Sequence, residues 1–165
     1  MDHQGDDYIA GYKTAADWRS LRGRLVDSQD VSLWREAFRN YFQERLDLRY
    51  LSPIRILQEH GTFQGEGFSI AAIQCSLIEF LESTLQGLTY RYVPRGQQVG
   101  QFEYSSSSEI FRQFLTQRYP FRNEFDSSIA TDFYASVRCG LLHEARTKNG
   151  WRIWADDGQG RIIDP

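Results

Sequence analysis

The sequence predicts a mainly helical protein with a short β-hairpin at its C-terminal end. Apolar side chains recur at steps of three and four residues over 30–46, 69–86, 109–119 and 127–147, as on one face of an α-helix. After residue 147 the period changes, and Trp151, Ile153, Ile162 and Ile163 flank the turn-rich sequence DDGQG at 156–160. Short apolar runs on both sides of such a turn indicate a hairpin.

The first half of the chain is expected to hold an N-terminal arm, a helix and a break. Residues 1–14 are polar and rich in Gly and Asp, and we expect 1–29 to form the arm. Asp30 or Ser32 can cap the helix that follows. Pro53 predicts a break, after which a short turn precedes Gly61.

The most apolar helix is expected in the middle of the chain. The loop GTFQGEG at 61–67 precedes it, Ser69 is a candidate N-cap and Gly87 a candidate stop. TYRYV at 89–93 predicts a short strand, followed by an exposed loop. A helix this apolar is expected to lie at the centre of the core.

Two more helices complete the predicted bundle. Pro120 ends the first, at 109–119, and Ser127 or Ser128 can cap the second, at 127–147. The length of 165 residues fits one domain. We therefore predict a single domain over 1–165, with the arm at 1–29, the helical bundle at 30–147 and the hairpin at 148–165.

Composition and charge exclude several classes of protein. Hydrophobic residues make up 41% of the chain, enough for a packed core. No apolar run approaches the roughly 20 residues that cross a bilayer, and the N-terminus lacks a signal-peptide layout, so we expect a cytoplasmic protein without membrane contact. The net charge of −3 excludes a strongly basic nucleic-acid coat. Cys75 and Cys139 form no zinc-like spacing with the three histidines, and we expect buried thiols and no metal site.

The sequence R-x4-H occurs twice, at Arg55–His60 and at Arg138–His143. With 17 arginines and three histidines, chance alone gives roughly 0.3 matches, so the spacing carries little weight by itself. His60 precedes Gly61 and is expected at a helix end, where its charge complements the dipole. Arg138 and His143 lie within the long final helix, so this copy is the stronger candidate.

The final helix has an unusual outer face. Its expected core stripe comprises Ile129, Phe133, Val137, Gly140 and Leu141. At about 100° per residue, Arg138 and His143 are roughly 140° apart, one beyond each edge of that stripe. Asp132, Ala135 and Leu142 are expected between them. Small and apolar residues there suggest a second helix, and the same helix from another subunit would bring two arginines and two histidines together.

FYASVRCGLLHEARTKNGW at 133–151 resembles the motif helix of HEPN domains, in which a histidine follows an arginine by four to six residues. The resemblance implies an antiparallel HEPN-like helical bundle. It also implies a metal-independent endoribonuclease with a composite site at a homodimer interface, needing no cofactor. Family members often have a polar residue after the arginine, where this chain has Cys139, so a catalytically inactive module that binds RNA or protein stays open.

The resemblance assigns chemical roles to two residues. His143 would act as general acid or base at the ribose 2′-hydroxyl and the leaving oxygen, and Arg138 would bind the scissile phosphate. The products would carry 2′,3′-cyclic phosphate ends. Such proteins are often toxins or antiviral defence components, which implies RNA as substrate and an antitoxin or sensor protein as partner.

Several residues keep two interpretations. Arg146, Lys148 and Trp151 can contact phosphates and bases, or can be an ordinary helix C-terminus and hairpin anchor. Glu79 and Glu82 on the apolar helix are expected at its exposed edge. A plain helical interaction domain with a coincidental motif is the third possibility for the whole chain.

Overall fold

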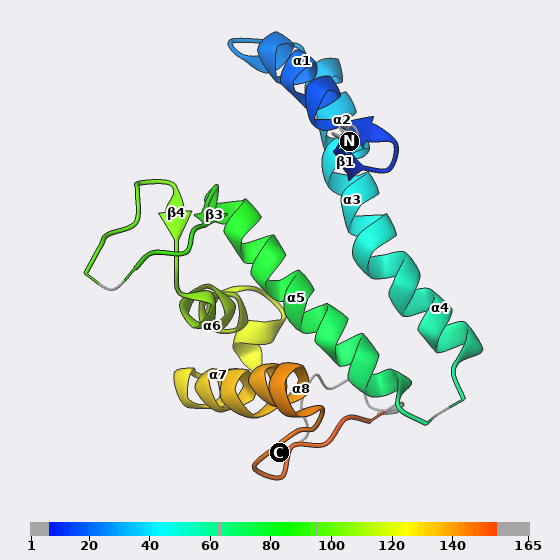
Figure 1. Ribbon diagram of the computed structural model, residues 1–165, viewed down its shortest axis with the longest axis vertical. Helices are drawn as coiled ribbons and strands as arrows, with labels where there is room; N and C mark the ends of the chain where they lie inside the picture. The colour runs from blue at the N-terminus through cyan, green and yellow to red at the C-terminus, as the bar shows by residue number, and fades with distance from the viewer. Residues whose placement is uncertain (1–6, 63, 95, 155–165) are drawn as a thin grey trace, which may run out of the picture. The chain divides into compact units, whose positions relative to one another are not determined.

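The computed structural model describes residues 7–62, 64–94 and 96–154, and it is mainly helical (Figure 1). Its contacts divide the chain into two compact units, Met1–Gly61 and Thr62–Pro165. Each unit has its own cluster of buried apolar side chains. The sequence predicted a single domain over 1–165. The structure has two separate hydrophobic cores, one in each unit.

Unit 1 begins with a small antiparallel ladder, β1 (Tyr8–Ala10) and β2 (Lys13–Thr14), followed by α1 (Ala15–Leu25). The arm predicted over 1–29 therefore contains a helix. Its start is a capping box: the Asp17 N–H donates to Thr14 Oγ1 at 3.1 Å, and the Thr14 N–H donates to Asp17 Oδ2 at 2.9 Å. These reciprocal bonds satisfy two backbone donors that a helix end leaves open.

A continuous helical run from Val31 to His60 forms the rest of unit 1. It comprises α2 (Val31–Ala37), the π-helical segment η1 (Phe38–Gln43), α3 (Glu44–Leu46), the π-helical segment η2 (Asp47–Leu51) and α4 (Ser52–His60). Asp30 caps it, as predicted, by accepting the Ser32 N–H at 2.8 Å. The break predicted at Pro53 is wrong, because the backbone stays helical through Ser52. The wider π turn before Pro53 gives room for a ring that clashes with the preceding turn of an α-helix.

The core of unit 1 joins α1 to the first turns of the long run. Its buried residues are Leu21, Leu25, Leu33 and Ala37, and Trp18 and Tyr41 pack against them. The rings of Trp18 and Tyr41 lie 4.9 Å apart. The Arg45 side chain also donates to the Ile9 carbonyl at 3.0 Å, which ties β1 to the helix.

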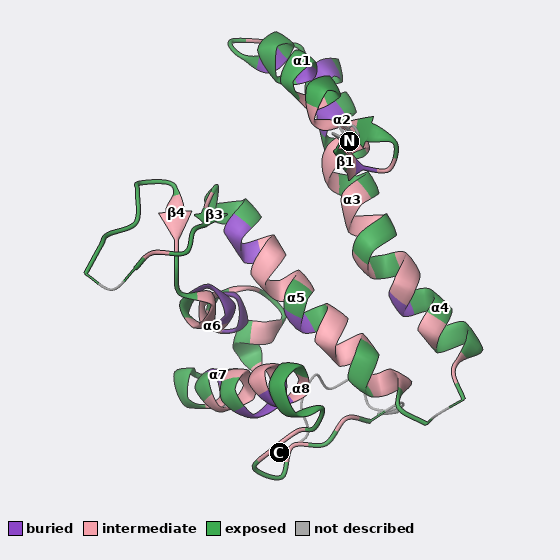
Figure 2. Ribbon diagram, viewed as in Figure 1, coloured by how far each residue is buried: buried purple, intermediate pink, exposed green. Residues whose placement is uncertain are grey.

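Unit 2 is built around α5 (Glu66–Gln86), with α6 (Ser107–Gln117) and a final helical run lying on one side of it (Figure 1). The final run comprises α7 (Ser127–Phe133), the π-helical segment η4 (Tyr134–Arg138) and α8 (Cys139–Glu144), and the 3-10 turn η3 (Phe121–Asn123) precedes it. Buried residues gather where these helices meet (Figure 2): Cys75, Phe111, Phe114, Leu115, Phe125 and Ala130. The helices predicted at 109–119 and 127–147 are confirmed, although they end earlier, at Gln117 and Glu144.

The ends of α5 show which sequence signals were informative. The predicted cap Ser69 is wrong, because the helix begins three residues earlier at Glu66. The Glu66 carboxylate accepts the backbone N–H groups of Thr62, Gln64 and Gly65, which lowers its pKa to about 2. The predicted stop at Gly87 is confirmed, with φ at 67° in the left-handed region.

Strands are few in the described residues of unit 2. Thr89–Tyr90 forms β3, inside the predicted strand 89–93, and pairs in parallel with β4 (Glu103–Tyr104). The predicted hairpin at 148–165 falls largely outside the described residues, which end at 154. Residues 151–154 form no strand.

One helix in the described part of the chain, α5, is long and apolar enough to cross a membrane by length and composition, with a mean hydropathy of 1.3. The expectation from the sequence concerned unbroken apolar runs, and Gln74, Glu79 and Glu82 interrupt α5. Glu82 on this helix bonds to Arg118, and Cys75 packs in the core of unit 2. Such contacts are typical of the central helix of a soluble domain, and a cytoplasmic location stays a prediction.

Asp126 caps the final helical run, in place of the predicted Ser127 or Ser128. Its Oδ1 accepts the N–H groups of Ser128 and Ile129, each at 2.8 Å. We expect Asp126→Ala to lower the free energy of unfolding by about 1 kcal/mol, measured by urea denaturation. Ser128→Ala removes a side chain that caps nothing and serves as the control. Equal losses in the two variants would contradict this assignment of the cap.

Candidate functional site

Arg138 is the last residue of the π-helical segment η4 and lies beside α5. Its Nη2 is 3.5 Å from Glu79 Oε2, and its guanidinium carbon is 5.3 Å from the centre of the Tyr134 ring. Only 19% of the Arg138 side chain is exposed. A charge-assisted N–H···O bond is usually 2.7–2.9 Å long, so this single contact is loose. The guanidinium is enclosed but is not locked in a bidentate pair.

Glu79 is shared between Arg138 and a tyrosine. The Tyr104 hydroxyl of β4 donates to Glu79 Oε1 at 3.1 Å. Burial and the adjacent Glu79 charge raise the pKa of Tyr104 to about 12, which keeps the phenol protonated as the donor. Burial also raises the pKa of Tyr134, and the nearby Arg138 charge opposes that shift. The sequence reading missed this cluster; the signal was a carboxylate on an otherwise apolar helix, which needs a partner when it is enclosed.

The predicted exposed edge at Glu79 and Glu82 is wrong for both residues. Glu79 is largely enclosed, with 17% of its side chain exposed, and Glu82 is fully buried. Arg118 donates to both oxygens of Glu82 at 2.8 Å, and these bonds lower the pKa of Glu82. Glu82 therefore anchors α6 to α5, whereas Glu79 lies next to the motif arginine.

His143 lies on the exposed surface of α8, one turn beyond Arg138. Among the described residues, no hydrogen bond or ion pair holds its imidazole, and none joins it to Arg138. The helix ends two residues later at Ala145, whose φ of 54° is left-handed. Within one chain, the two motif residues are therefore not brought together: Arg138 is enclosed beside α5, and His143 faces solvent.

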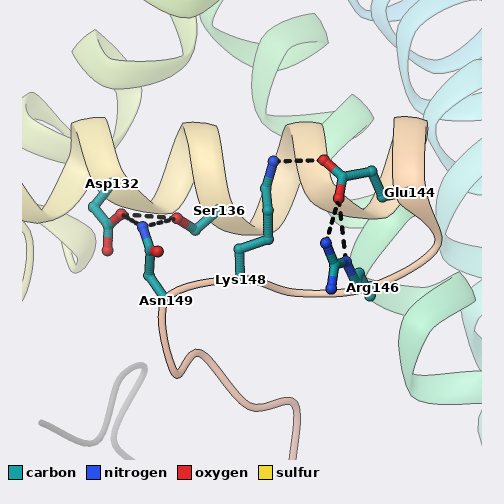
Figure 3. Close-up of polar contacts among 6 residues, drawn as sticks. All are labelled: Asp132, Ser136, Glu144, Arg146, Lys148 and Asn149. Carbon is teal, nitrogen blue, oxygen red and sulfur yellow. Dashed lines mark hydrogen bonds and ion pairs between the residues drawn. The ribbon is translucent and has the colours of Figure 1, made fainter.

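Arg146 and Lys148 both bind the same carboxylate (Figure 3). Arg146 Nη2 is 2.9 Å from Glu144 Oε2, and Lys148 Nζ is 2.7 Å from Glu144 Oε1. Both cations lower the pKa of Glu144, and Lys148 has the larger effect. The positive charge predicted here for phosphate contact is thus partly neutralised within the chain.

Trp151 is held against the final helical run as an anchor. Its indole N–H donates to Asp132 Oδ2 at 2.7 Å, and its ring meets Phe133 edge-on at 5.1 Å. Asp132 Oδ1 also accepts from Ser136 at 2.7 Å and from the Asn149 amide at 2.9 Å (Figure 3). All three donors lower the pKa of Asp132, and the bond from Trp151 has the largest effect. The anchor interpretation of Trp151 describes these contacts better than a free stacking surface does.

The face predicted from Asp132, Ala135 and Leu142 is divided by the π-helical segment. A π turn adds about one residue to the α-helical turn, which rotates positions before it by roughly 100° relative to positions after it. Asp132 accordingly points to the returning segment and its Asn149, whereas Ala135 and Leu142 are exposed. Asp132 is therefore engaged within the chain, and the dimer interface at Asp132, Ala135 and Leu142 stays a prediction.

The second copy of the motif has a structural explanation. Arg55 pairs with Asp47 at 2.9 Å and donates to Ser52 at the same distance. His60 is the exposed last residue of α4, as predicted.

No group of three or more His, Cys, Asp or Glu side chains that could hold a metal ion occurs in residues 7–62, 64–94 and 96–154. Both cysteines are free thiols; Cys75 is buried, which raises its pKa to about 12, and Cys139 is half-buried.

No family model, no curated protein and no solved structure matches this chain.

Proposed function

We propose that the protein is a metal-independent endoribonuclease of the HEPN type, with Arg138 and His143 as its catalytic residues. The observation that carries this proposal is the state of the two side chains. Arg138 is enclosed yet makes only one loose ion pair, and His143 is exposed without a partner among the described residues. An enclosed arginine that serves only stability is usually held by shorter or bidentate contacts than this one, and an exposed imidazole is free to meet a substrate.

The proposed chemistry needs only proton transfer and charge stabilisation. Imidazole exchanges protons near neutral pH, so His143 can accept the proton of the ribose 2′-hydroxyl or donate one to the leaving oxygen. The 2′-oxygen attacks the adjacent phosphorus, the bond to the 5′-oxygen breaks, and a 2′,3′-cyclic phosphate forms. Arg138 stabilises the extra negative charge on the phosphate in the transition state.

A second copy of the chain would complete the site. One copy offers a single imidazole in solvent and a single guanidinium beside α5. A two-fold axis near the exposed Ala135 and Leu142 would bring two such pairs together. We therefore propose a homodimer, with RNA as substrate, and keep an antitoxin or sensor partner and a role in toxicity or antiviral defence as parts of the same proposal.

A catalytically inactive HEPN-like module that binds RNA or protein is the second candidate. The Glu79–Arg138 contact favours it, because an anion already occupies one edge of the guanidinium. Cys139, where relatives of this type often have a polar residue, points the same way.

Cleavage of mixed RNA in the presence of EDTA tests the proposal. We expect the wild type to give fragments with cyclic phosphate ends, and Arg138→Ala and His143→Ala each to lower the rate by about 100-fold or more. Arg55→Ala and His60→Ala remove the same residue types at the same spacing and should keep the wild-type rate. Equal cleavage by all five proteins would identify a contaminant and reject the enzyme. RNA binding without cleavage would favour the inactive module, and a strict monomer in sedimentation would reject the composite site.

A further inference from the structure

A shallow hollow on the first turns of the long helix in unit 1 combines aromatic and cationic walls. Its volume is about 420 Å³. The residues that line it are Val31, Trp34, Arg35, Phe38, Arg39 and Gln43, all of them exposed. Neither the proposed catalytic site nor the core of unit 1 uses these side chains.

The hollow follows from the spacing of its residues along one helix face. Steps of three and four residues from Val31 lead to Trp34 and Arg35, and the same steps lead on to Phe38 and Arg39. Glu36 falls on a different side of the helix and does not line the hollow. The face therefore carries two positive charges and no carboxylate.

The two arginines are uncompensated. Among the described residues, neither Arg35 nor Arg39 makes a side-chain hydrogen bond or ion pair. Further along the same helical run, Arg45 donates to the Ile9 carbonyl and Arg55 pairs with Asp47. Within this helical run, the other arginines thus make internal contacts, whereas these two make none among the described residues.

The two aromatic side chains are held in place while half of each stays exposed. The Trp34 indole N–H donates to the Ser28 carbonyl at 3.1 Å, and the Phe38 ring stacks on Phe42 at 5.2 Å. Trp34 and Phe38 remain 53% and 55% exposed. Rings fixed in this way lose little freedom when a flat ligand stacks on them.

We propose that this face binds single-stranded RNA, with bases stacked on Trp34 and Phe38 and phosphates paired with Arg35 and Arg39. Charge favours RNA over an apolar protein segment. Such a segment would bury two guanidinium groups without partners, which is costly, whereas RNA brings a phosphate with every nucleotide. The choice of RNA over DNA rests on the proposed function.

Fluorescence anisotropy with a labelled 16-nucleotide unstructured RNA tests the surface. The full chain carries His143→Ala in every sample, so that the probe is not cleaved. We expect Phe38→Ala to weaken binding at least about fivefold, the low end for one lost base stack. Arg35→Gln with Arg39→Gln should weaken binding as well and lower the salt slope by about 1.4, at about 0.7 per phosphate contact on a single strand. Arg19→Gln with Arg22→Gln removes the same charge from exposed positions of α1 and should change the affinity less than twofold. Circular dichroism checks that each variant is folded.

Three results would contradict the RNA-binding proposal. They are no RNA binding by the His143→Ala protein, equal RNA affinities in all variants, or a change of oligomeric state in Phe38→Ala with RNA binding unaffected. The last would identify a protein interface. Cleavage by the protein with an intact His143 is measured separately, which keeps the two proposals distinct. If binding depends on Phe38 but no RNA is cleaved, the RNA-binding proposal holds and the endoribonuclease proposal is rejected. If RNA is cleaved but all variants bind it with equal affinity, the endoribonuclease proposal holds and the RNA-binding proposal is rejected.

Discussion

Replacing Arg118 with methionine is expected to destabilise the protein by about 3 kcal/mol at pH 7, measured by urea denaturation. The substitution leaves the Glu82 carboxylate fully buried with only the Gln86 amide, at 2.6 Å, as a donor. Removing one partner of a buried ion pair typically costs 3–5 kcal/mol because the other charge stays in a poor solvent. We take the low end because 39% of the Arg118 side chain is exposed, so water can reach the vacated space.

The loss is expected to depend on pH with a defined sign. In the wild type, Arg118 lowers the pKa of Glu82 below its ordinary value of 4.5, so this group contributes stability above pH 4.5 that is lost as the pH falls. Without the arginine, burial raises the pKa of the same carboxyl, which then binds a proton more readily in the folded state. The difference in stability between wild type and Arg118→Met should therefore shrink from pH 7 to pH 4.

A double variant provides the control. Glu82→Gln together with Arg118→Met removes both charges and should recover much of the stability that Arg118→Met loses. A difference that is the same at both pH values, or a double variant no more stable than Arg118→Met, would show that the Glu82 charge is not the cause.

Gly140→Ala is expected to destabilise the protein by up to about 2 kcal/mol, although alanine is a better helix former than glycine. A Cβ at Gly140 would lie 2.5 Å from the Arg146 carbonyl oxygen and 3.6 Å from Lys148 Cε. The nearer contact is with backbone, so the segment returning after α8 must move, and overpacking of this kind costs more than the roughly 1 kcal/mol that helix propensity returns. That movement would strain the bond from the Lys148 N–H to the Ser136 carbonyl, now 3.0 Å.

Gly23→Ala is the matched control for this prediction. Gly23 also lies inside a helix, α1, and an added Cβ meets nothing within 4 Å. We expect this variant to gain about 0.5–1 kcal/mol in the same denaturation experiment. Two shifts of the same sign would mean that the close approach at Gly140 does not control stability.

The sequence predicted well what depends on local chemistry. Asp30 as a cap, Gly87 as a stop and the final helix each rest on side chains acting on their own backbone, and all three are confirmed. The capping box at Thr14 and Asp17 was also readable, but α1 is too polar to show a clear apolar period and was assigned to the arm.

Contacts between segments that are distant in the sequence could not be predicted from the spacing of apolar and polar residues. Glu82 and Arg118 are 36 residues apart, and nothing in the spacing of either joins them. The same holds for the Glu79–Arg138 contact and for Trp151 against Phe133, which depend on how the helices pack. Both catalytic candidates could be found from sequence, but the residues around Arg138 could not.

The π-helical segment at Tyr134–Arg138 has a consequence for relatives of this chain. A homologue one residue shorter there could keep the same motif letters and regain a regular α-helix. Its histidine would then swing about a quarter of a turn around the helix axis relative to the residues at the helix start. The direction in which the histidine side chain leaves the helix decides which groups it can reach. Two chains with the same number of residues between arginine and histidine can therefore present the histidine to different neighbours.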